Sequence, residues 1–307
     1  MATATPSSGH TDQAASRLDV GVVSAGTVGA VLGHALSRAG HRVVAAAAVS
    51  DESKRRAQRL LPGAEILPVD EVASSAALLL IAVPDDAIAD LVDGLARGGH
   101  VQPGQIVAHV SGAYGVEVLR PVAELGALPL AVHPAMTFTG RAEDVNRLDG
   151  CSFGVTCDPA LRPVAEALVV EMGGEPEFVA EKHRALYHAA LSHGSNHLTT
   201  LVNEALDLLR ACGVEHPDRM LAPLLSAALD NTLRLGDKAL TGPIVRGDSG
   251  TVAAHVTTLR REAPDAVIAY QALARRTADR AIAAGKLDVD QAETLLGCLA
   301  DDDPKGP

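Results

Sequence analysis

Residues 19–50 decide the fold class of this chain, and they read DVGVVSAGTVGAVLGHALSRAGHRVVAAAAVS. An apolar run leads into a turn of small residues, then a helical pattern that ends at Gly40, then a second apolar run. This order predicts a strand, a tight loop, a helix and a strand, the unit that binds a dinucleotide in doubly wound α/β folds. Gly26 lets the backbone approach a pyrophosphate, and Gly29 lets the helix pack close to the strand. The predicted cofactor-binding turn consists of Ser24, Ala25, Gly26, Thr27 and Val28.

The first position of this turn departs from the usual pattern, because Ser24 stands where G-x-G-x-x-G has its first glycine. Serine can form a tight turn, and the helix start behind it offers free N–H groups and a favourable dipole to a phosphate. The alternative is a doubly wound fold whose site binds no dinucleotide. The context, directly after a strand and directly before a helix, favours a variant of the motif.

The end of the second strand bears on the choice of cofactor. An acidic residue there binds the ribose hydroxyls of NAD, whereas Ser50 occupies the position here and Asp51 follows it. Ser53 and Arg55, next along the chain, can hold a 2′-phosphate, so we expect NADP(H) rather than NAD(H). The alternative is that the cations at residues 54–56 form only a solvated helix face.

Three further apolar runs, at residues 77–83, 105–110 and 128–132, predict parallel strands of the same sheet. Ligands bind at the carboxyl ends of such strands. We therefore expect Val83, Pro84 and Ser111 to contact the cofactor. His133 follows the third run, where it either lines the site or belongs to a turn before Pro134.

The pattern then changes from strands to helices. Two short strands, at residues 152–156 and 177–179, extend the predicted sheet, and only helical patterns follow them. We expect a tail at residues 1–17, a dinucleotide-binding domain of Rossmann type at 18–180, an all-helical domain at 181–300 and an acidic tail at 301–307.

The predicted catalytic residues lie in the second half of the chain. Helical spacing places His188, Ser195 and Asn196 along one polar face, which either forms a wall of the substrate site or allows close helix packing. Arg246 stands beside a predicted helix start, where its guanidinium either binds a carboxylate or pairs with Asp248.

A metal site is not expected. His193 and His197 share a helix face, but neither the glutamate of H-E-x-x-H nor a third carboxylate ligand accompanies them.

The net charge and the amino-acid composition disfavour several classes of partner. A net charge of −12, with aromatic residues at only 2%, disfavours nucleic acid and anionic membranes. No apolar run is long enough to span a bilayer. The four cysteines form no C-x-x-C pair, which is typical of reduced cytoplasmic thiols.

Several longer strings carry a resemblance to known families. The first half resembles the NADP-binding domains of pyrroline-5-carboxylate reductase, the deazaflavin-dependent NADP reductases and the 3-hydroxyacid dehydrogenases. The second half is similar to domain of unknown function 2520. The strings are VPDD at 83–86, SGA at 111–113, HP at 133–134, YHAA at 187–190, SN at 195–196 and TGPIVRGD at 241–248. The resemblance implies a helical domain like that of 6-phosphogluconate dehydrogenase, and a homodimer formed through it.

The resemblance does not extend to one catalytic pair. In hydroxyacid dehydrogenases a lysine is followed four residues later by asparagine, whereas Lys182 is followed at that spacing by Leu186.

The leading hypothesis is an NADP-dependent oxidoreductase acting on a small carboxylate-bearing substrate, either a 2-oxo acid such as ketopantoate or a cyclic imine. In it, His188 donates a proton, with His133 as second candidate, and Arg246 binds the carboxylate. The alternative is a non-catalytic NADP(H)-binding sensor or regulatory protein.

Overall fold

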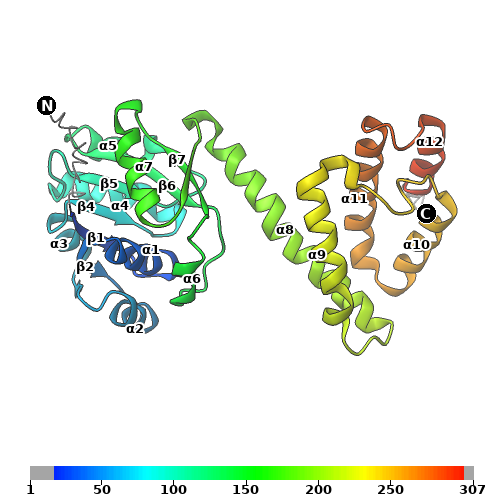
Figure 1. Cartoon of the computed structure of the whole chain (residues 1–307), viewed down its shortest axis with the longest axis horizontal. Helices are drawn as coiled ribbons and strands as arrows, with labels where there is room; N and C mark the ends of the chain where they lie inside the picture. Colours follow the sequence, from blue (N-terminus) through cyan, green and yellow to red (C-terminus); the bar gives the residue numbers. More distant parts are fainter. Residues whose placement is uncertain (1–16, 301–307) are drawn as a thin grey trace, which may run out of the picture. The chain divides into compact units, whose positions relative to one another are not determined.

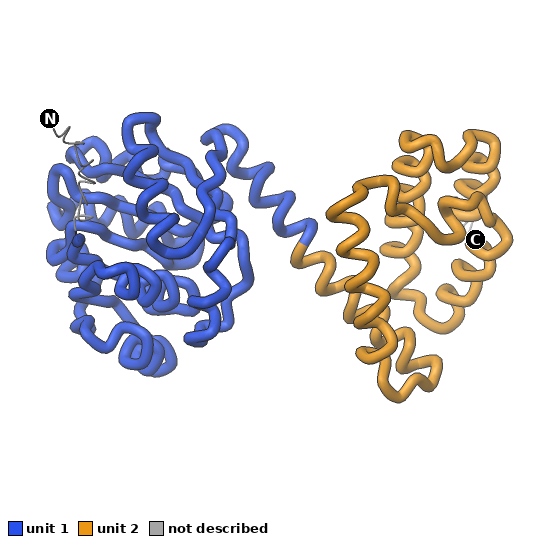
Figure 2. The backbone as a smooth tube through the Cα atoms, viewed as in Figure 1, with its two compact units in different colours: residues 1–194 blue, residues 195–307 orange. Residues whose placement is uncertain are grey.

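The computed structural model describes residues 17–300, so both predicted tails, apart from Arg17, lie outside the described residues. The chain divides into two compact units, residues 1–194 and 195–307 (Figure 2). The division falls within one long helix, α8 (Arg184–Ala211). Among residues 17–300, no helix combines the length and apolar character that crossing a membrane requires.

Unit 1 is built on an eight-stranded sheet with the order β3-β2-β1-β4-β5-β6-β7-β8 (Figure 1). All neighbouring strands are parallel except β6 and β7, which are antiparallel. The mostly parallel, doubly wound sheet predicted from the sequence is confirmed. The strands are β1 (Asp19–Val23), β2 (Arg42–Ala47), β3 (Glu65–Ile66), β4 (Leu78–Ile81), β5 (Ile106–His109), β6 (Leu128–Pro134), β7 (Ser152–Thr156) and β8 (Glu175–Phe178).

Helices cover both faces of the sheet, which explains why its central strands are apolar on both sides. Leu78 and Leu80 of β4 face one core, and the alternate residues Leu79 and Ile81 face the other. The helices of this unit are α1 (Thr27–Arg38), α2 (Asp51–Leu60), α3 (Val69–Ser74), α4 (Asp85–Gly98), α5 (Arg120–Ala123), α6 (Glu143–Asn146) and α7 (Arg162–Glu171). Three short 3-10 helices, η1 (Val116–Leu119), η2 (Pro159–Leu161) and η3 (Glu181–His183), complete it.

Unit 2 is helical, as the sequence predicts. After the second half of α8 come α9 (Pro217–Leu235), η4 (Gly236–Ala239), α10 (Ser249–Glu262), α11 (Pro264–Ala283) and α12 (Val289–Cys298). A separate core forms where α10, α11 and α12 pack, around side chains such as Val252, Ala278 and Leu295. In contrast, α8 buries only Arg184 and α9 buries only Pro217.

Candidate functional site

The turn between β1 and α1 has the backbone that the altered glycine motif requires. Ser24 has a φ of 76°, in the left-handed region that usually calls for glycine. The Ala25 N–H donates to the Ala47 carbonyl of β2 (2.9 Å), which fastens the turn to the neighbouring strand. Ser24 therefore takes the backbone conformation of the motif's first glycine. The turn follows the same path although that glycine is absent.

The two glycines of the turn face different surroundings. A Cβ placed on Gly26 would lie 3.4 Å from Ser24 Oγ, with no other protein atom within 4 Å. A Cβ on Gly29 would overlap the Ser24 carbonyl oxygen and lie 2.9 Å from Ala82 Cβ. Gly29 thus serves the packing of α1 against the sheet. Gly26 leaves open space at the N-terminus of α1, which fits a pyrophosphate.

The remaining predicted cofactor residues lie along the same edge of the sheet. Val83 and Pro84 follow β4, and Ser111 follows β5. Because β1, β4 and β5 are parallel neighbours, their carboxyl ends meet at this edge. Between β1 and β4 the direction of the strand order reverses, which is where ligands bind in open α/β sheets.

The tip of β2 carries the two predicted hydroxyls. Ser50 caps α2, accepting a hydrogen bond from the Ser53 N–H (3.1 Å), and its own hydroxyl lies 3.1 Å from Ser53 Oγ. Lys54 and Arg55 are exposed on the first turns of α2. A 2′-phosphate at this tip would meet two hydroxyls and two cations.

Arg56 differs from its neighbours Lys54 and Arg55 in its surroundings. It does not belong to a solvated face, because only 8% of it is exposed. Its Nη2 donates to Glu52 Oε1 (2.5 Å), and its Nη1 lies 3.5 Å from the Ala25 carbonyl oxygen of the cofactor turn. Its buried Nε has no hydrogen-bond partner within the described part of the chain. A cation buried against this turn adds positive potential where phosphate charge would lie.

The histidine at the end of β5 has a structural role. His109 is fully buried; its Nε2 lies 2.7 Å from the Gly115 carbonyl oxygen, and its Nδ1 accepts a hydrogen bond from the Ser111 N–H (3.2 Å). Burial is the main cause that lowers the pKa of His109 to about 4. The neutral ring, donating from Nε2, shapes the loop that carries Ser111.

Three ring side chains gather beside that loop. His133 Nδ1 is hydrogen-bonded to the Tyr187 hydroxyl (2.9 Å), and the rings of His133 and His188 meet edge to face with centroids 6.1 Å apart. A Cβ on Gly112 would lie 2.6 Å from His188 Cδ2 and 2.9 Å from His133 Nε2. These contacts bring His133 together with Tyr187 and His188 beside the loop of Ser111, and its role in lining the site stays a prediction.

The ionisation of this cluster follows from its burial. Desolvation, followed by the charge of Arg184, lowers the pKa of His133 to about 4, so this ring is neutral at pH 7. Desolvation raises the pKa of Tyr187, which keeps its hydroxyl protonated. In the sequence, Tyr187 stands out only as the first residue of YHAA at 187–190, one of the segments that carry the family resemblance. Its contact with His133 depends on a strand 54 positions away, which no local pattern reveals.

Arg184 fixes the start of α8 to the sheet. Its guanidinium is buried and donates to three backbone carbonyls, those of Tyr114 (2.8 Å), Gly154 (3.0 Å) and Ser111 (2.5 Å). Glu181, just before it, accepts a hydrogen bond from the Val116 N–H (2.8 Å). Opposite charges thus hold the same segment against one loop, and Tyr187 and His188 follow within one helical turn.

The other predicted catalytic residues belong to unit 2. Ser195 and Asn196 are exposed on α8, and the Ser195 carbonyl accepts a hydrogen bond from Thr199 Oγ1 (3.2 Å). Unit 1 therefore brings His188 together with His133 and the loop of Ser111. Ser195, Asn196 and Arg246 belong to the other unit.

Arg246 is presented by a well-anchored loop. Its neighbours Ile244 and Val245 are buried, whereas Arg246 is exposed and makes no side-chain hydrogen bond or ion pair within residues 17–300. The alternative was an Arg246–Asp248 pair; the two form no ion pair within residues 17–300, although the hydrogen bonds from Thr251 and, in addition, the charge of Arg246 lower the pKa of Asp248. Asp248 instead caps α10, accepting hydrogen bonds from the Thr251 N–H (3.0 Å) and hydroxyl (2.7 Å). The helix start that was expected to help bind an anion is thus already occupied by Asp248, and the Arg246 guanidinium remains available.

Comparison with family models matches residues 2–134 to a Rossmann-like domain and residues 151–277 to domain of unknown function DUF2520. The chain combines these two domains. The combination confirms the resemblance inferred from the sequence strings. No curated protein sequence matches the chain.

Several solved structures share the fold of the Rossmann-like and DUF2520 domains together. A candidate NADP oxidoreductase of Bacteroides fragilis is 21% identical with a TM-score of 0.70, over 86% of this chain and 98% of that one. An imine reductase of a Pseudomonas species is 19% identical with a TM-score of 0.60, over 92% and 100%. The pyrroline carboxylate reductase of Plasmodium falciparum, solved with NADP, is 10% identical with a TM-score of 0.54, over 91% and 98%. At these identities the likeness concerns the fold.

Proposed function

We propose that this protein is an NADP-dependent oxidoreductase, which transfers a hydride between NADP(H) and a small carboxylate-bearing substrate, a 2-oxo acid or a cyclic imine. The observation that carries the proposal is the edge of the sheet in unit 1. There an open helix N-terminus at Gly26 follows β1, and a cluster of protonatable rings forms between His133 of β6 and Tyr187 and His188 of α8. Structures of the same fold that are named imine reductase, pyrroline carboxylate reductase and NADP oxidoreductase support it.

The residues of this chain have separate roles in the proposed reaction. The nicotinamide cofactor, when bound, supplies the hydride chemistry, and the protein positions the reactants. His188 donates the proton to the reduced carbonyl or imine, because His133 is already neutral at pH 7 and serves to orient the ring beside it. Ser195 and Asn196 bind the reacting group, and the exposed Arg246 guanidinium binds the carboxylate.

The preference for NADP over NAD rests on the tip of β2. Ser50, Ser53 and Arg55 offer two hydroxyls and a cation, and no acidic side chain takes the position of Ser50. We expect NADPH to bind at least about tenfold more tightly than NADH, a difference readily measured by titration calorimetry. Equal affinities would contradict this assignment.

Removal of either proposed catalytic group is expected to affect turnover in a characteristic way. His188→Ala should lower kcat between about a hundredfold and ten-thousandfold in NADPH oxidation with a panel of 2-oxo acids and cyclic imines, because a general acid contributes that much. Arg246→Ala should mainly raise KM, because it removes a substrate contact. His216→Ala and Arg219→Ala, at exposed positions in or just before α9, are matched controls that should leave both constants unchanged.

The same panel separates the enzyme from the sensor. If no substrate is turned over, and thermal unfolding shows stabilisation by NADPH but none from any added acid, the non-catalytic alternative holds. An enzyme requires additional stabilisation by a carboxylate, lost in Arg246→Ala.

We also propose a homodimer formed through the helical unit. The α9 helix has 19 residues and buries only Pro217, although it carries five largely exposed apolar side chains. These are Met220, Leu224, Leu229, Leu233 and Leu235. Helices in proteins owe most of their stability to the packing of apolar side chains, so these exposed side chains call for a partner. Light scattering should give twice the 31.5 kDa of one chain.

Substitution of one of these exposed apolar side chains tests the dimer. Leu233, with 77% of its surface exposed, should yield monomers when replaced by glutamate. The control Val170→Glu changes an exposed apolar residue of α7 in unit 1 and should leave the dimer intact. A monomeric wild-type chain at micromolar concentration would refute the proposal.

The four free cysteines support a reducing compartment such as the cytoplasm.

A further inference from the structure

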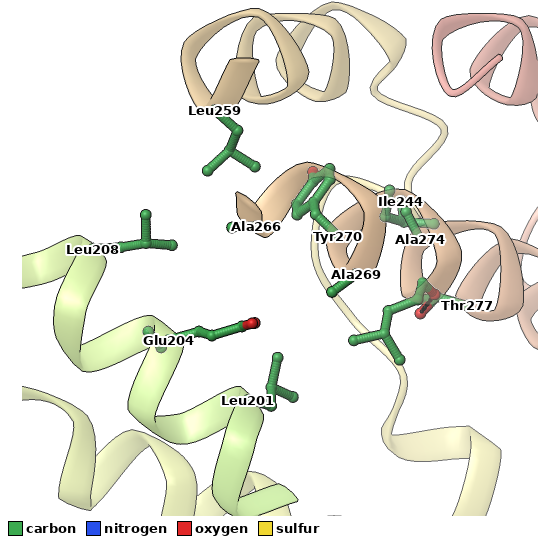
Figure 3. Close-up of a pocket in the computed structure, with 12 residues that line it drawn as sticks. Leu201, Glu204, Leu208, Ile244, Leu259, Ala266, Ala269, Tyr270, Ala274 and Thr277 are labelled. Atoms are coloured by element: carbon green, nitrogen blue, oxygen red, sulfur yellow. Dashed lines mark hydrogen bonds between the residues drawn. The ribbon is translucent and has the colours of Figure 1, made fainter. Parts of the chain in front are cut away.

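Unit 2 contains an apolar groove that the proposed reaction does not use. It has a volume of about 250 Å³ and lies between the second half of α8 and the helices α10 and α11 (Figure 3). Leu208 enters it from α8, Leu259 from α10, and Tyr270 and Leu273 from α11. The residues that form it all belong to unit 2, and none of the side chains assigned a catalytic role lines it.

One carboxylate lies among these apolar side chains. Glu204 extends from α8 into the groove, with its oxygen atoms in the space between α8 and α11 (Figure 3). It is partly buried, and it makes no hydrogen bond or ion pair within residues 17–300. A carboxylate held against apolar surface without a partner carries a desolvation cost that a bound cation would offset.

The other polar groups of the groove are already satisfied. The Tyr270 hydroxyl is hydrogen-bonded to His255 Nδ1 (2.9 Å), and Thr277 Oγ1 donates to the Leu273 carbonyl (2.8 Å). Among the side chains that line the groove, Glu204 is the one with a formal charge, and its hydrogen-bonding capacity is that of an acceptor. An anion or a second acceptor would be repelled by it.

We propose that this groove binds a small amphiphilic ammonium ion, with the cationic nitrogen at Glu204 and the apolar body against the leucine side chains and Tyr270. Both the apolar walls of the groove and the charge of Glu204 point to this class of ligand. The apolar walls favour a hydrocarbon or aromatic body, and the lone carboxylate at the side of the groove selects a protonated amine over a neutral or acidic compound of the same size.

Three probes that share a phenylethyl body and differ in charge test the proposal with the full-length protein at pH 7. Calorimetric titration should show that 2-phenylethylamine binds at least about tenfold more tightly than 2-phenylethanol, and that 3-phenylpropionate does not bind measurably. Glu204→Gln, which keeps the size of the side chain, should bring the amine down to the affinity of the alcohol. Ala269→Phe, which fills the groove, should abolish binding of both.

The matched control is Asp207→Asn. It removes one negative charge from the same helix at an exposed position outside the groove, so the preference for the amine should persist. Equal affinity for amine and alcohol, or a preference that survives Glu204→Gln, overturns the proposal. Absence of binding also overturns it, and means that a second copy of the chain or another partner covers the groove. Because the titrations contain no cofactor, their failure leaves the proposed oxidoreductase untouched.

Discussion

Replacing Gly26 by alanine is expected to weaken NADP(H) binding between about tenfold and a hundredfold, because a methyl group would stand where the pyrophosphate approaches the backbone. The same change should leave the free energy of unfolding within about 1 kcal/mol of the wild type. No protein atom other than Ser24 Oγ lies within 4 Å of the added carbon, and the φ of −70° at Gly26 suits alanine. Calorimetric titration with NADPH and thermal unfolding without it measure the two quantities.

Gly29→Ala is the matched control for this prediction. It adds the same methyl group three residues later, where it meets the Ser24 carbonyl oxygen and Ala82, so it should destabilise the fold by about 1–3 kcal/mol or more. Gly26→Ala thus tests the cofactor contact, and Gly29→Ala tests the packing of α1. Full NADPH affinity in Gly26→Ala would show that the cofactor does not lie on this turn.

The fold was predictable where a segment is long and its environment uniform. The β1–α1–β2 unit, the buried runs of β4 and β5, and the bounds of α9 all follow from periodicity and from the residues that end each run. The sequence does not reveal β3, which has two residues, or the four-residue helices α5 and α6. Elements of that length are too short to show a repeating pattern, and their backbone is fixed by the elements against which they pack, such as β2 for β3 and α1 for α6.

The backbone of the candidate site was easier to predict from the sequence than the positions of its buried charged side chains. The turn at Gly26 follows from the motif, because its requirement is local. Arg56 and Arg184 have no local signature, since each is buried by segments far away in the chain and donates to backbone carbonyls that any residue type supplies. For the same reason the sequence did not distinguish His109, which shapes a loop, from His133, which lies in the ring cluster.

Arg184→Met is expected to be the most destabilising substitution in unit 1, at about 3–5 kcal/mol, because it leaves three buried carbonyls without their charged donor. Methionine keeps much of the side chain's volume, so the loss reports mainly the hydrogen bonds to Ser111, Tyr114 and Gly154. Chemical denaturation measures the change. Activity should fall as well, because Arg184 fixes the helical turn that carries Tyr187 and His188.

Arg162→Met is the control for this second prediction. The Arg184 guanidinium carbon lies 5.2 Å from the centroid of the Tyr187 ring, and Arg162 likewise lies over Phe178 at 4.6 Å but is exposed. Its removal should cost no more than about 1 kcal/mol, as expected of an exposed cation–π contact. Arg184→Lys should fall between the two, because one ammonium group cannot reach three carbonyls that a guanidinium spans. If Arg184→Met is no more destabilising than Arg162→Met, the three hydrogen bonds do not hold α8 to the sheet. The proposed role of His188 as proton donor would then lose its structural basis.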